Sequence, residues 1–416
     1  MIKILLLAFL LYGCSTAEIE LSGNIANPAT ISSEGRLDSI LTSYRSEAAF
    51  LIAADGTAAY LPASSYSYLH LYKSDGEIHA QSDSLPAFYN LKNISEISLY
   101  RPDPSYSLSV LQGNQSIEIY TPFSARLAEF RLLGASSRYG NYASKYEYSS
   151  PFRLPAFVDS ILTLTNDGKY IWYDRIDFSH AFSLQSNHFK LEADTLVAIW
   201  QNPPQQDIFS LHNMIDTYPN PLLVIIIDSY GYIYHQHLAA LGEKNYLHDL
   251  DVQPLRSAYP PKSRYNIWAL GSGDRLQNRN GARELFNFTT FENSVFIGGA
   301  IQLFAKEIEF VSAIDTLRYN DYAIFRQASE RIRSGKHDLI FVHFVSIDEA
   351  GHDYGAYSIE RLEQTKVVAS YIEELVKLWN GDVLFLSDHG MHDKDSKGTH
   401  FRAIDEDIIG IWGVIK

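Results

Sequence analysis

The chain has 416 residues, of which 46% are hydrophobic and 20% are charged, as is typical of a globular rather than a disordered protein. Its net charge of −15 argues against a general nucleic-acid-binding surface, because phosphate backbones require a basic partner. The charge does not exclude phosphorylated substrates, since bound metal ions can reverse the sign of a local field.

The N-terminus has the features of an export signal. Lys3 precedes an apolar run over residues 4–11, and Gly13-Cys14 follows. The run is shorter than the roughly 20 residues that span a bilayer. The pattern resembles a bacterial lipoprotein signal, in which cleavage leaves the cysteine to carry lipid; the alternative is an ordinary secretory signal. We therefore expect a signal peptide over 1–13 and a tether over 14–35, and a protein exported to the bacterial cell envelope and lipid-anchored to a membrane.

Residues 36–200 are predicted to form a β-rich accessory domain of unknown role. Short alternating segments predict strands over 66–72, 116–120 and 170–178, and Lys73-Ser74-Asp75-Gly76 predicts a turn. No catalytic cluster is recognisable in this range.

A Pro- and Gln-rich linker over 201–206 precedes a different pattern over residues 207–416. The aliphatic run 222–227 is typical of a parallel strand that is buried on both faces. Similar runs recur at 338–348, 382–388 and 407–414, and helical patterns lie over 320–334 and 358–379. This alternation predicts an α/β domain with a doubly wound, mostly parallel sheet, which binds ligands at the carboxyl ends of its strands.

Chemistry-bearing side chains follow three of these predicted strands. The aspartates are Asp228, Asp348 and Asp388, and the histidines are His352, His389 and His400. Alone, a strand-end aspartate can equally be a helix cap, and a single loop histidine has little meaning. Together the six supply carboxylate and imidazole ligands for two divalent ions, with zinc expected first and manganese second.

In order along the chain, Ile227-Asp228, Asp348 with His352, Asp388-His389-Gly390-Met391 and His400 match motifs of a known superfamily. The chain resembles the alkaline-phosphatase superfamily, and most closely its type I phosphodiesterase and nucleotide pyrophosphatase branch. The resemblance covers about residues 220–416. It implies an alkaline-phosphatase-like fold and a two-metal site that acts on phosphate esters.

The same resemblance implies roles for individual residues. Ser263, in Lys262-Ser263-Arg264, would be the nucleophile and would pass through a phosphoserine, with Ser229 as the competing candidate. One metal would be bound by Asp228, Ser263, Asp388 and His389, and the other by Asp348, His352 and His400. Substrate contacts are expected from Lys262, Asn266 and Asn280. His343 and His392 are expected only at the surface or behind the ligands.

These features predict a metal-dependent hydrolase of phosphate esters that prefers diesters. The alternatives are a phosphoethanolamine-type transferase or a phosphomonoesterase of the same superfamily, and a non-catalytic surface binding protein. The short spacing from Asp388 to His400 is similar to that of the ethanolamine-phosphate transferases of glycolipid-anchor synthesis.

The lipoprotein pattern is testable on the native protein. We expect Cys14 to carry lipid and to be the first residue of the mature chain. Mass spectrometry of the native N-terminus would measure this directly. An unmodified mature chain that starts after Cys14 would contradict lipidation but would leave export intact.

Overall fold

A computed structural model describes most of the chain. The described residues are 17–25, 28–101, 107–138, 141–154, 157, 160–173, 182–185, 187–219, 221–276, 286, 288–298, 308–312 and 321–415. Cys14 and Asn280 lie outside them. Among the residues described, no helix has both the length and the apolar composition needed to cross a bilayer.

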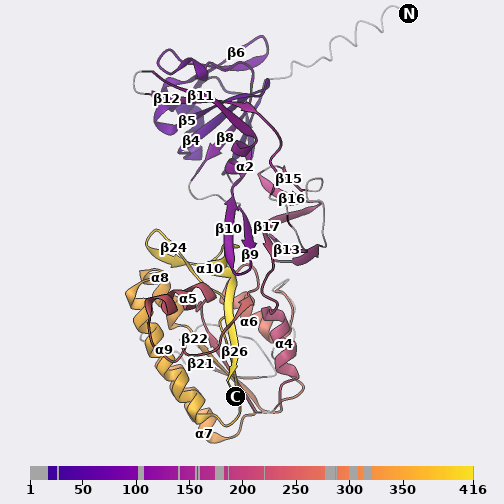
Figure 1. Cartoon of the computed structure of the whole chain (residues 1–416), viewed down its shortest axis with the longest axis vertical. Coiled ribbons are helices and arrows are strands. Elements are labelled where there is room, and N and C mark those ends of the chain that lie inside the picture. The colour runs from indigo at the N-terminus through magenta and orange to yellow at the C-terminus, as the bar shows by residue number, and fades with distance from the viewer. Residues whose placement is uncertain are drawn as a thin grey trace, which may run out of the picture. The chain divides into compact units, whose positions relative to one another are not determined.

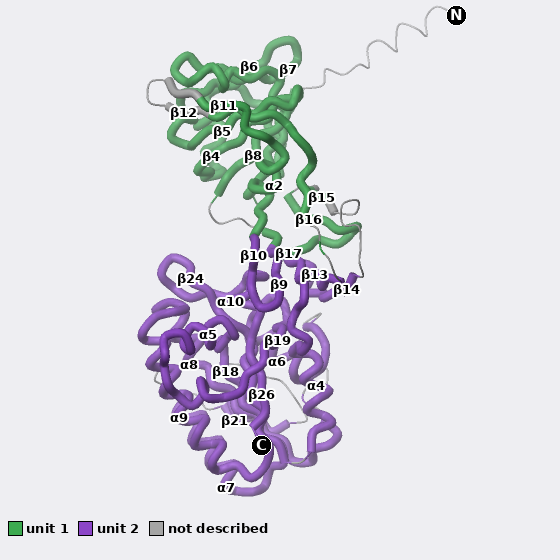
Figure 2. The backbone as a smooth tube through the Cα atoms, in the orientation of Figure 1, with its two compact units in different colours: residues 1–108, 119–158, 175–197 green, residues 109–118, 159–174, 198–416 purple. Residues whose placement is uncertain are grey.

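The chain divides into two compact units (Figure 2). Unit 1 comprises residues 1–108, 119–158 and 175–197, and unit 2 comprises 109–118, 159–174 and 198–416. Unit 2 thus includes two segments, 109–118 and 159–174, that the sequence analysis assigned to the accessory range.

Unit 1 is rich in β-structure, as expected. Its main sheet has the strand order β11-β12-β5-β4-β8-β1-β2, and a smaller one has the order β3-β6-β7. The strands are β1 (Ile19–Gly23), β2 (Ala29–Ile31), β3 (Gly35–Arg36), β4 (Ala48–Ala53), β5 (Thr57–Pro62), β6 (His70–Ser74), β7 (Glu77–Gln81), β8 (Ile94–Tyr100), β11 (Phe130–Arg138), β12 (Asn141–Tyr148), β15 (Phe182–Gln185) and β16 (His188–Leu191). The short helices are α1 (Leu37–Leu41), η1 (Thr42–Tyr44), η2 (Ala63–Tyr68), η3 (Ala87–Tyr89) and α2 (Pro122–Ala128).

A further sheet has the strand order β10-β9-β17-β13-β14. Its strands are β9 (Leu108–Gln112), β10 (Gln115–Tyr120), β13 (Ile161–Thr165), β14 (Tyr170–Tyr173) and β17 (Asp194–Gln201). β9 and β17 pair in parallel, with Ala198 opposite Ser109.

The C-terminal half is a mixed α/β structure, as expected (Figure 1). Its sheet has the order β19-β26-β23-β18-β22-β20-β21, in which β26 is antiparallel to both its neighbours and the other pairs are parallel. The strands are β18 (Leu222–Ile227), β19 (Gln253–Arg256), β20 (Ser294–Gly298), β21 (Glu309–Ser312), β22 (Leu339–Phe344), β23 (Asp382–Leu386) and β26 (Ile409–Ile415), with a separate hairpin of β24 (His392–Lys394) and β25 (Lys397–Thr399). The helices are α4 (Ile208–Asp216), α5 (Tyr232–Leu241), α6 (Ser263–Ser272), α7 (Asp321–Ser334), α8 (Ser346–Tyr354), α9 (Ile359–Leu378) and α10 (Asp405–Ile408).

Strand β18 explains why this sheet is covered on both faces. All six of its residues are buried and aliphatic. Leu223, Ile225 and Ile227 pack in one core cluster with α5, α7 and α9, whereas Leu222, Val224 and Ile226 pack in another with α4 and α6. A strand with apolar side chains on both faces needs such a cover on each side.

Most predicted elements agree with the structure, and three differ. The strands at 222–227 and 382–388 and both predicted helices are present. The strand predicted over 338–348 ends at Phe344, and helix α8 begins at Ser346. The strand predicted over 66–72 is wrong in its first half, because residues 63–68 form a 3-10 turn in which Leu69 N donates to Tyr66 O. The strand predicted from 407 begins at Ile409, since α10 occupies 405–408.

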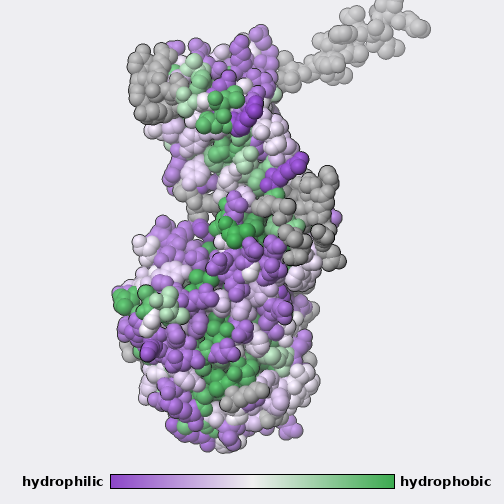
Figure 3. All heavy atoms as spheres, in the orientation of Figure 1, coloured by the Kyte–Doolittle hydropathy of each residue, from purple (hydrophilic) through white to green (hydrophobic). Residues whose placement is uncertain are grey.

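The face shown in Figure 3 has many hydrophilic residues, interrupted by hydrophobic patches. This distribution is ordinary for folded domains, because single exposed apolar side chains are common.

Candidate metal centre

The parallel strands bring the predicted ligands to one edge of the sheet. Asp228 follows β18, and Asp388 lies two residues beyond the end of β23, which pairs with β18 in parallel. α8 begins directly after β22, which pairs with the other side of β18, and it carries Asp348 and His352. Parallel strands end at the same edge, so the three aspartates lie close together.

The first group surrounds the predicted nucleophile. Ser263 begins α6, and its Oγ donates to Asp228 Oδ1 at 3.0 Å. The same Oγ lies 3.2 Å from His389 Nε2, which is 3.5 Å from Asp388 Oδ2. The structure therefore brings Asp228, Ser263, Asp388 and His389 together.

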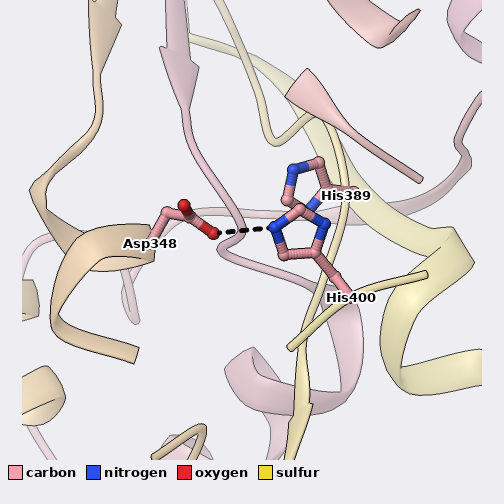
Figure 4. Close-up of side chains that lie close together, drawn as sticks. All are labelled: Asp348, His389 and His400. Atoms are coloured by element: carbon pink, nitrogen blue, oxygen red, sulfur yellow. Dashed lines mark ion pairs between the residues drawn. The ribbon is translucent and has the colours of Figure 1, made fainter. Parts of the chain in front are cut away.

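The second group forms around Asp348. His352 Nε2 lies 3.3 Å from Asp348 Oδ2, one helical turn along α8, and His400 Nε2 lies 3.4 Å from Asp348 Oδ1. Figure 4 shows the Asp348 carboxylate pointing toward His400. The rings of His400 and His389 stack, with 4.0 Å between their centroids. His389 thus lies between the two groups.

Backbone carbonyls orient all three imidazoles of these groups. The Nδ1 atoms of His352, His389 and His400 lie 2.9, 2.9 and 2.6 Å from the carbonyl oxygens of Gly398, Gly390 and Pro261. A carbonyl only accepts, so each Nδ1 donates and each Nε2 keeps its lone pair toward the centre. Metal-ligating histidines are oriented in this way.

The three buried carboxyl groups have shifted pKa values in this arrangement. Burial, and then the charges of Asp388 and Asp348, raise the pKa of Asp228 well above its usual value. Burial raises the pKa of Asp388 to about 6. Burial alone would also raise the pKa of Asp348, but the imidazoles of His352, His400 and His389 lower it below its usual range.

Several buried atoms of the candidate ligands have no hydrogen-bond partner, and a bound cation would supply one. Asp348 Oδ1 and Asp388 Oδ2 are such atoms, and the Nε2 lone pairs of His352 and His400 face each other at 3.1 Å. Two acceptors at this distance repel unless a proton or a cation lies between them. The donor set is oxygen and nitrogen without thiolate, so these residues fit divalent ions such as zinc or manganese.

His343 is a site residue that the sequence analysis underrated. One of its ring nitrogens and a carboxylate oxygen from each of Asp228 and Asp388 all lie within 4.8 Å of one another. Asp348, His389 and His400 form a second set of possible ligand atoms at the same spacing. Nε2 of His343 lies 3.2 Å from Asp228 Oδ2, and the ring is fully buried at the end of β22. The available signal was a polar residue inside an aliphatic strand, five residues before Asp348.

Buried polar groups hold the ligand-bearing segments. The carboxylate of Asp321, at the start of α7, accepts from the backbone N–H groups of Val345 and Ser346 at 3.1 and 3.2 Å, and so fixes the start of α8. Asp407 accepts from the N–H groups of Phe401 and Arg402, directly after His400, at 2.9 and 2.8 Å.

His392 completes this support. Its Nδ1 lies 2.7 Å from Asp407 Oδ1, and the ring is buried rather than at the surface. Gly390 is needed between His389 and this region, because a Cβ there would lie 1.9 Å from Glu406 O.

Ser229 has an environment that does not suit a nucleophile. Its side chain is fully buried, and the guanidinium of Arg361 donates to its Oγ at 2.9 Å and to its carbonyl at 2.7 Å. Its φ of 59° is a left-handed conformation that few side chains adopt without support. Arg361, itself buried against the Tyr234 ring, supplies that support.

The expected substrate contacts have different outcomes. Asn266 Oδ1 accepts from Ala258 N at 2.6 Å and its Nδ2 donates to Lys262 O at 3.1 Å, so the amide is engaged in the turn before α6, which argues against a substrate contact. Lys262 is exposed, with Nζ 4.4 Å from the Phe401 ring centroid. Asn280 lies outside the described residues.

The family comparison agrees with the motifs. Residues 286–408 match the model of the type I phosphodiesterase / nucleotide pyrophosphatase family. The match supports the resemblance to the type I phosphodiesterase branch that the motifs indicated. The match includes five of the six predicted ligands; Asp228 and Ser263 precede it.

Curated relatives with significant similarity are transferases by name. The chain is 34% identical over 149 residues to the GPI ethanolamine phosphate transferase 1 of Yarrowia lipolytica, a match that covers 32% of this chain and 15% of the relative. It is 39% identical over 67 residues to the GPI ethanolamine phosphate transferase 1 of Gibberella zeae, a match that covers 14% of this chain and 7% of the relative. The chain thus spans a small part of these relatives' length.

Solved structures with similar arrangements include the C-terminal periplasmic domain of EcEptC from Escherichia coli. It is 15% identical with a TM-score of 0.33, and the match covers 48% of this chain and 73% of that one. Murine ectonucleotide pyrophosphatase / phosphodiesterase 5 is 16% identical with a TM-score of 0.30, and the match covers 41% of this chain and 57% of that one.

The two ligand groups predict separable metal losses. Asp388→Asn should remove most of the metal beside Ser263, and His352→Ala most of the metal beside Asp348, because each removes one of the few donors of its group. Elemental analysis of purified protein measures the stoichiometry. Asp249→Asn, whose side chain is 77% exposed, is the control. Wild-type protein that is active without stoichiometric metal would refute the two-metal assignment.

His343 is expected to orient Asp228. His343→Ala should lower metal affinity about 10–100-fold, as loss of an outer hydrogen-bonding partner of a ligand usually does. Competition with a chromogenic chelator measures the affinity. An unchanged affinity would show that the contact with Asp228 has no such role.

Metal affinity should fall as the pH falls through about 6, because protons then occupy the Asp388 carboxyl that the cation requires. Asp228, whose pKa is also raised, acts in the same direction. Burial lowers the pKa of His400 to about 4, so this ring contributes little above pH 5. The hydrogen bond with Asp348 raises the pKa of His352, so protonation of that ring adds to the fall in affinity. Chelator competition at pH 5, 6, 7 and 8 measures this pH dependence, and a metal affinity that does not change over the range would contradict it.

Proposed function

We propose that the chain is a metal-dependent phosphoryl-ester transferase that moves an ethanolamine-phosphate-type group through a phosphoserine at Ser263. The main support is Ser263 Oγ, held 3.0 Å from Asp228 and 3.2 Å from His389 at the start of α6. The named activity of the curated relatives supports transfer over hydrolysis. The proposal includes a doubly wound, alkaline-phosphatase-like catalytic half.

The chain's own groups account for the orientation of the reactants. Because Ser263 donates its proton toward Asp228, an oxygen lone pair is free for attack on phosphorus. The positive end of the α6 dipole, at Ser263, favours a phosphate anion beside it. Lys262, exposed at this end, is a proposed contact for a phosphate oxygen.

Two substitutions at phosphorus complete the reaction. First the Ser263 Oγ–P bond forms, and the ester oxygen leaves with its bonding electrons. Then an acceptor hydroxyl oxygen bonds to phosphorus, Ser263 Oγ leaves and regains a proton, and the acceptor's proton is released. Divalent ions held by Asp228, Asp388 and His389 and by Asp348, His352 and His400 would supply positive charge for the attacking and leaving oxygens.

Hydrolysis of diesters, the first expectation from sequence, is the second candidate. It uses the same serine and differs only in that water takes the place of the acceptor alcohol. The family match over residues 286–408 favours it, because phosphodiesterases are members of that family. Lipid anchoring at the cell envelope through Cys14 remains part of the proposal.

Ser263→Ala should lower the release of p-nitrophenol from p-nitrophenyl phosphoethanolamine by on the order of 10³-fold or more, because it removes the attacking atom. Metal content should stay nearly intact. Ser229→Ala should have a much smaller effect, since its hydroxyl is bonded to Arg361. Rates and elemental analysis are measured on the same preparations.

Two outcomes would contradict the proposal. A greater loss with Ser229→Ala than with Ser263→Ala would overturn the choice of nucleophile. Product analysis that finds only free phosphoethanolamine, with every alcohol acceptor tested, would favour the hydrolase over the transferase.

A further inference from the structure

An exposed lysine and a half-exposed phenylalanine contact each other beside the metal centre. The Nζ atom of Lys262 lies 4.4 Å from the ring centroid of Phe401, which is 47% exposed although it is a large apolar residue. Lys262 directly precedes the proposed nucleophile Ser263, and Phe401 directly follows the candidate ligand His400. The contact therefore joins the two loops that carry these residues.

The backbone is held in place on both sides of this contact. Lys262 O accepts from Asn266 Nδ2 at 3.1 Å, and Lys262 N donates to Pro260 O at 2.8 Å. Phe401 N donates to the buried Asp407 carboxylate at 2.9 Å. The freedom of the lysine ammonium therefore comes from its own side-chain torsions, and the contact with the ring restricts them.

A series of ring contacts connects this pair to the proposed nucleophile. The Phe401 ring lies 4.9 Å from the His400 ring, centroid to centroid, and the His400 ring lies 4.0 Å from the His389 ring. His389 Nε2 is 3.2 Å from Ser263 Oγ. His400 also binds the loop before Ser263, because its Nδ1 donates to Pro261 O at 2.6 Å. The ammonium of Lys262 thus lies on the His400 side of the site.

The aromatic ring offers this ammonium something that another apolar side chain does not. The face of a phenyl ring attracts a cation through its quadrupole. A free lysine side chain loses rotamer entropy when it binds an anion, and a ring that already restricts the ammonium reduces that loss. If Phe401 served only to cover His400, leucine would do so as well, but leucine has no π-face.

We propose that Phe401 is a positioning residue for substrate binding, whose ring holds the Lys262 ammonium where it attracts the phosphate group that Ser263 attacks. This assignment rests on the proposed transfer through Ser263. Phe401 acts through Lys262 and not by contact with the phosphate. Loss of the ring therefore weakens phosphate binding only while Lys262 is present, and it leaves the metals bound.

Binding of inorganic phosphate to the zinc-loaded full chain, measured by isothermal titration calorimetry, tests this role without catalysis. Phe401→Leu should weaken binding about two- to fivefold, the value of an exposed cation–π contact, whereas Phe401→Tyr should bind phosphate like the wild type. Lys262→Met should weaken binding at least as much, and adding Phe401→Leu to it should cause no further loss. Zinc content should be the same in every variant. Lys377→Met, a charge loss on the exposed side of α9, is the control and should leave binding unchanged.

Four results would overturn the assignment. They are unchanged binding in Phe401→Leu, equal weakening by the leucine and tyrosine variants, a double variant whose loss is the product of the two single losses, and a loss of zinc in Phe401→Leu. The last result would show that the ring acts on His400 instead.

Kinetics separate this role from the proposed function. With p-nitrophenyl phosphoethanolamine, Phe401→Leu should raise KM about two- to fivefold and leave kcat nearly unchanged, because the ammonium attracts the phosphate before and during the reaction alike. A fall in kcat at unchanged KM would contradict the role of Phe401. If phosphate binding follows the expected pattern but no phosphoserine forms, the proposed function fails and the role of Phe401 in anion binding stands.

Discussion

Three buried carboxylates at one edge of the sheet are the constraint on which the site depends. Burial raises the pKa of Asp228 and of Asp388, and the charges of the neighbouring carboxylates raise them further. Ionised together without compensation they would be strongly unfavourable. Protons can relieve the repulsion at low pH, whereas at neutral pH a divalent cation relieves it more fully. The repulsion between the buried carboxylates, which destabilises the fold, therefore also creates affinity for metal.

The surrounding structure keeps this unfavourable cluster in place. Parallel pairing of β18 with β22 and β23 fixes where the aspartates emerge, and buried strand residues allow little adjustment. Backbone carbonyls fix the imidazoles through Nδ1, so their Nε2 atoms cannot turn away. Arg361, a buried cation with no carboxylate in direct contact among its described hydrogen bonds, holds the left-handed residue after Asp228. Rigid supports of this kind preorganise a site before its ligands arrive.

The sequence allowed prediction of those parts that depend on local pattern. Aliphatic runs predicted the strands, and the aspartates after them predicted one shared edge. His343 was placed only at the surface or behind the ligands, because a polar residue within an aliphatic strand stands out but nothing local separates a buried core histidine from a site residue. The 3-10 turn at 63–68 has the same alternation as a strand. Residues 109–118 belong to unit 2, where β9 pairs with β17; these strands are far apart along the chain, and no local pattern encodes such a contact.

The segments outside the family match supply what distinguishes this chain. The match begins at residue 286, yet Asp228 and Ser263 precede it. Two segments from the N-terminal half of the chain contact loops of the site. The turn at Gly168 lies against Tyr259, and Ser116 Oγ accepts from Asp405 N at 3.1 Å, next to the α10 turn whose Asp407 supports the residues after His400. Residues far from the candidate ligands in sequence thus support the loops that carry Ser263 and His400. Substrate choice should accordingly change with residues 109–118 and 159–174 more readily than with the ligands themselves.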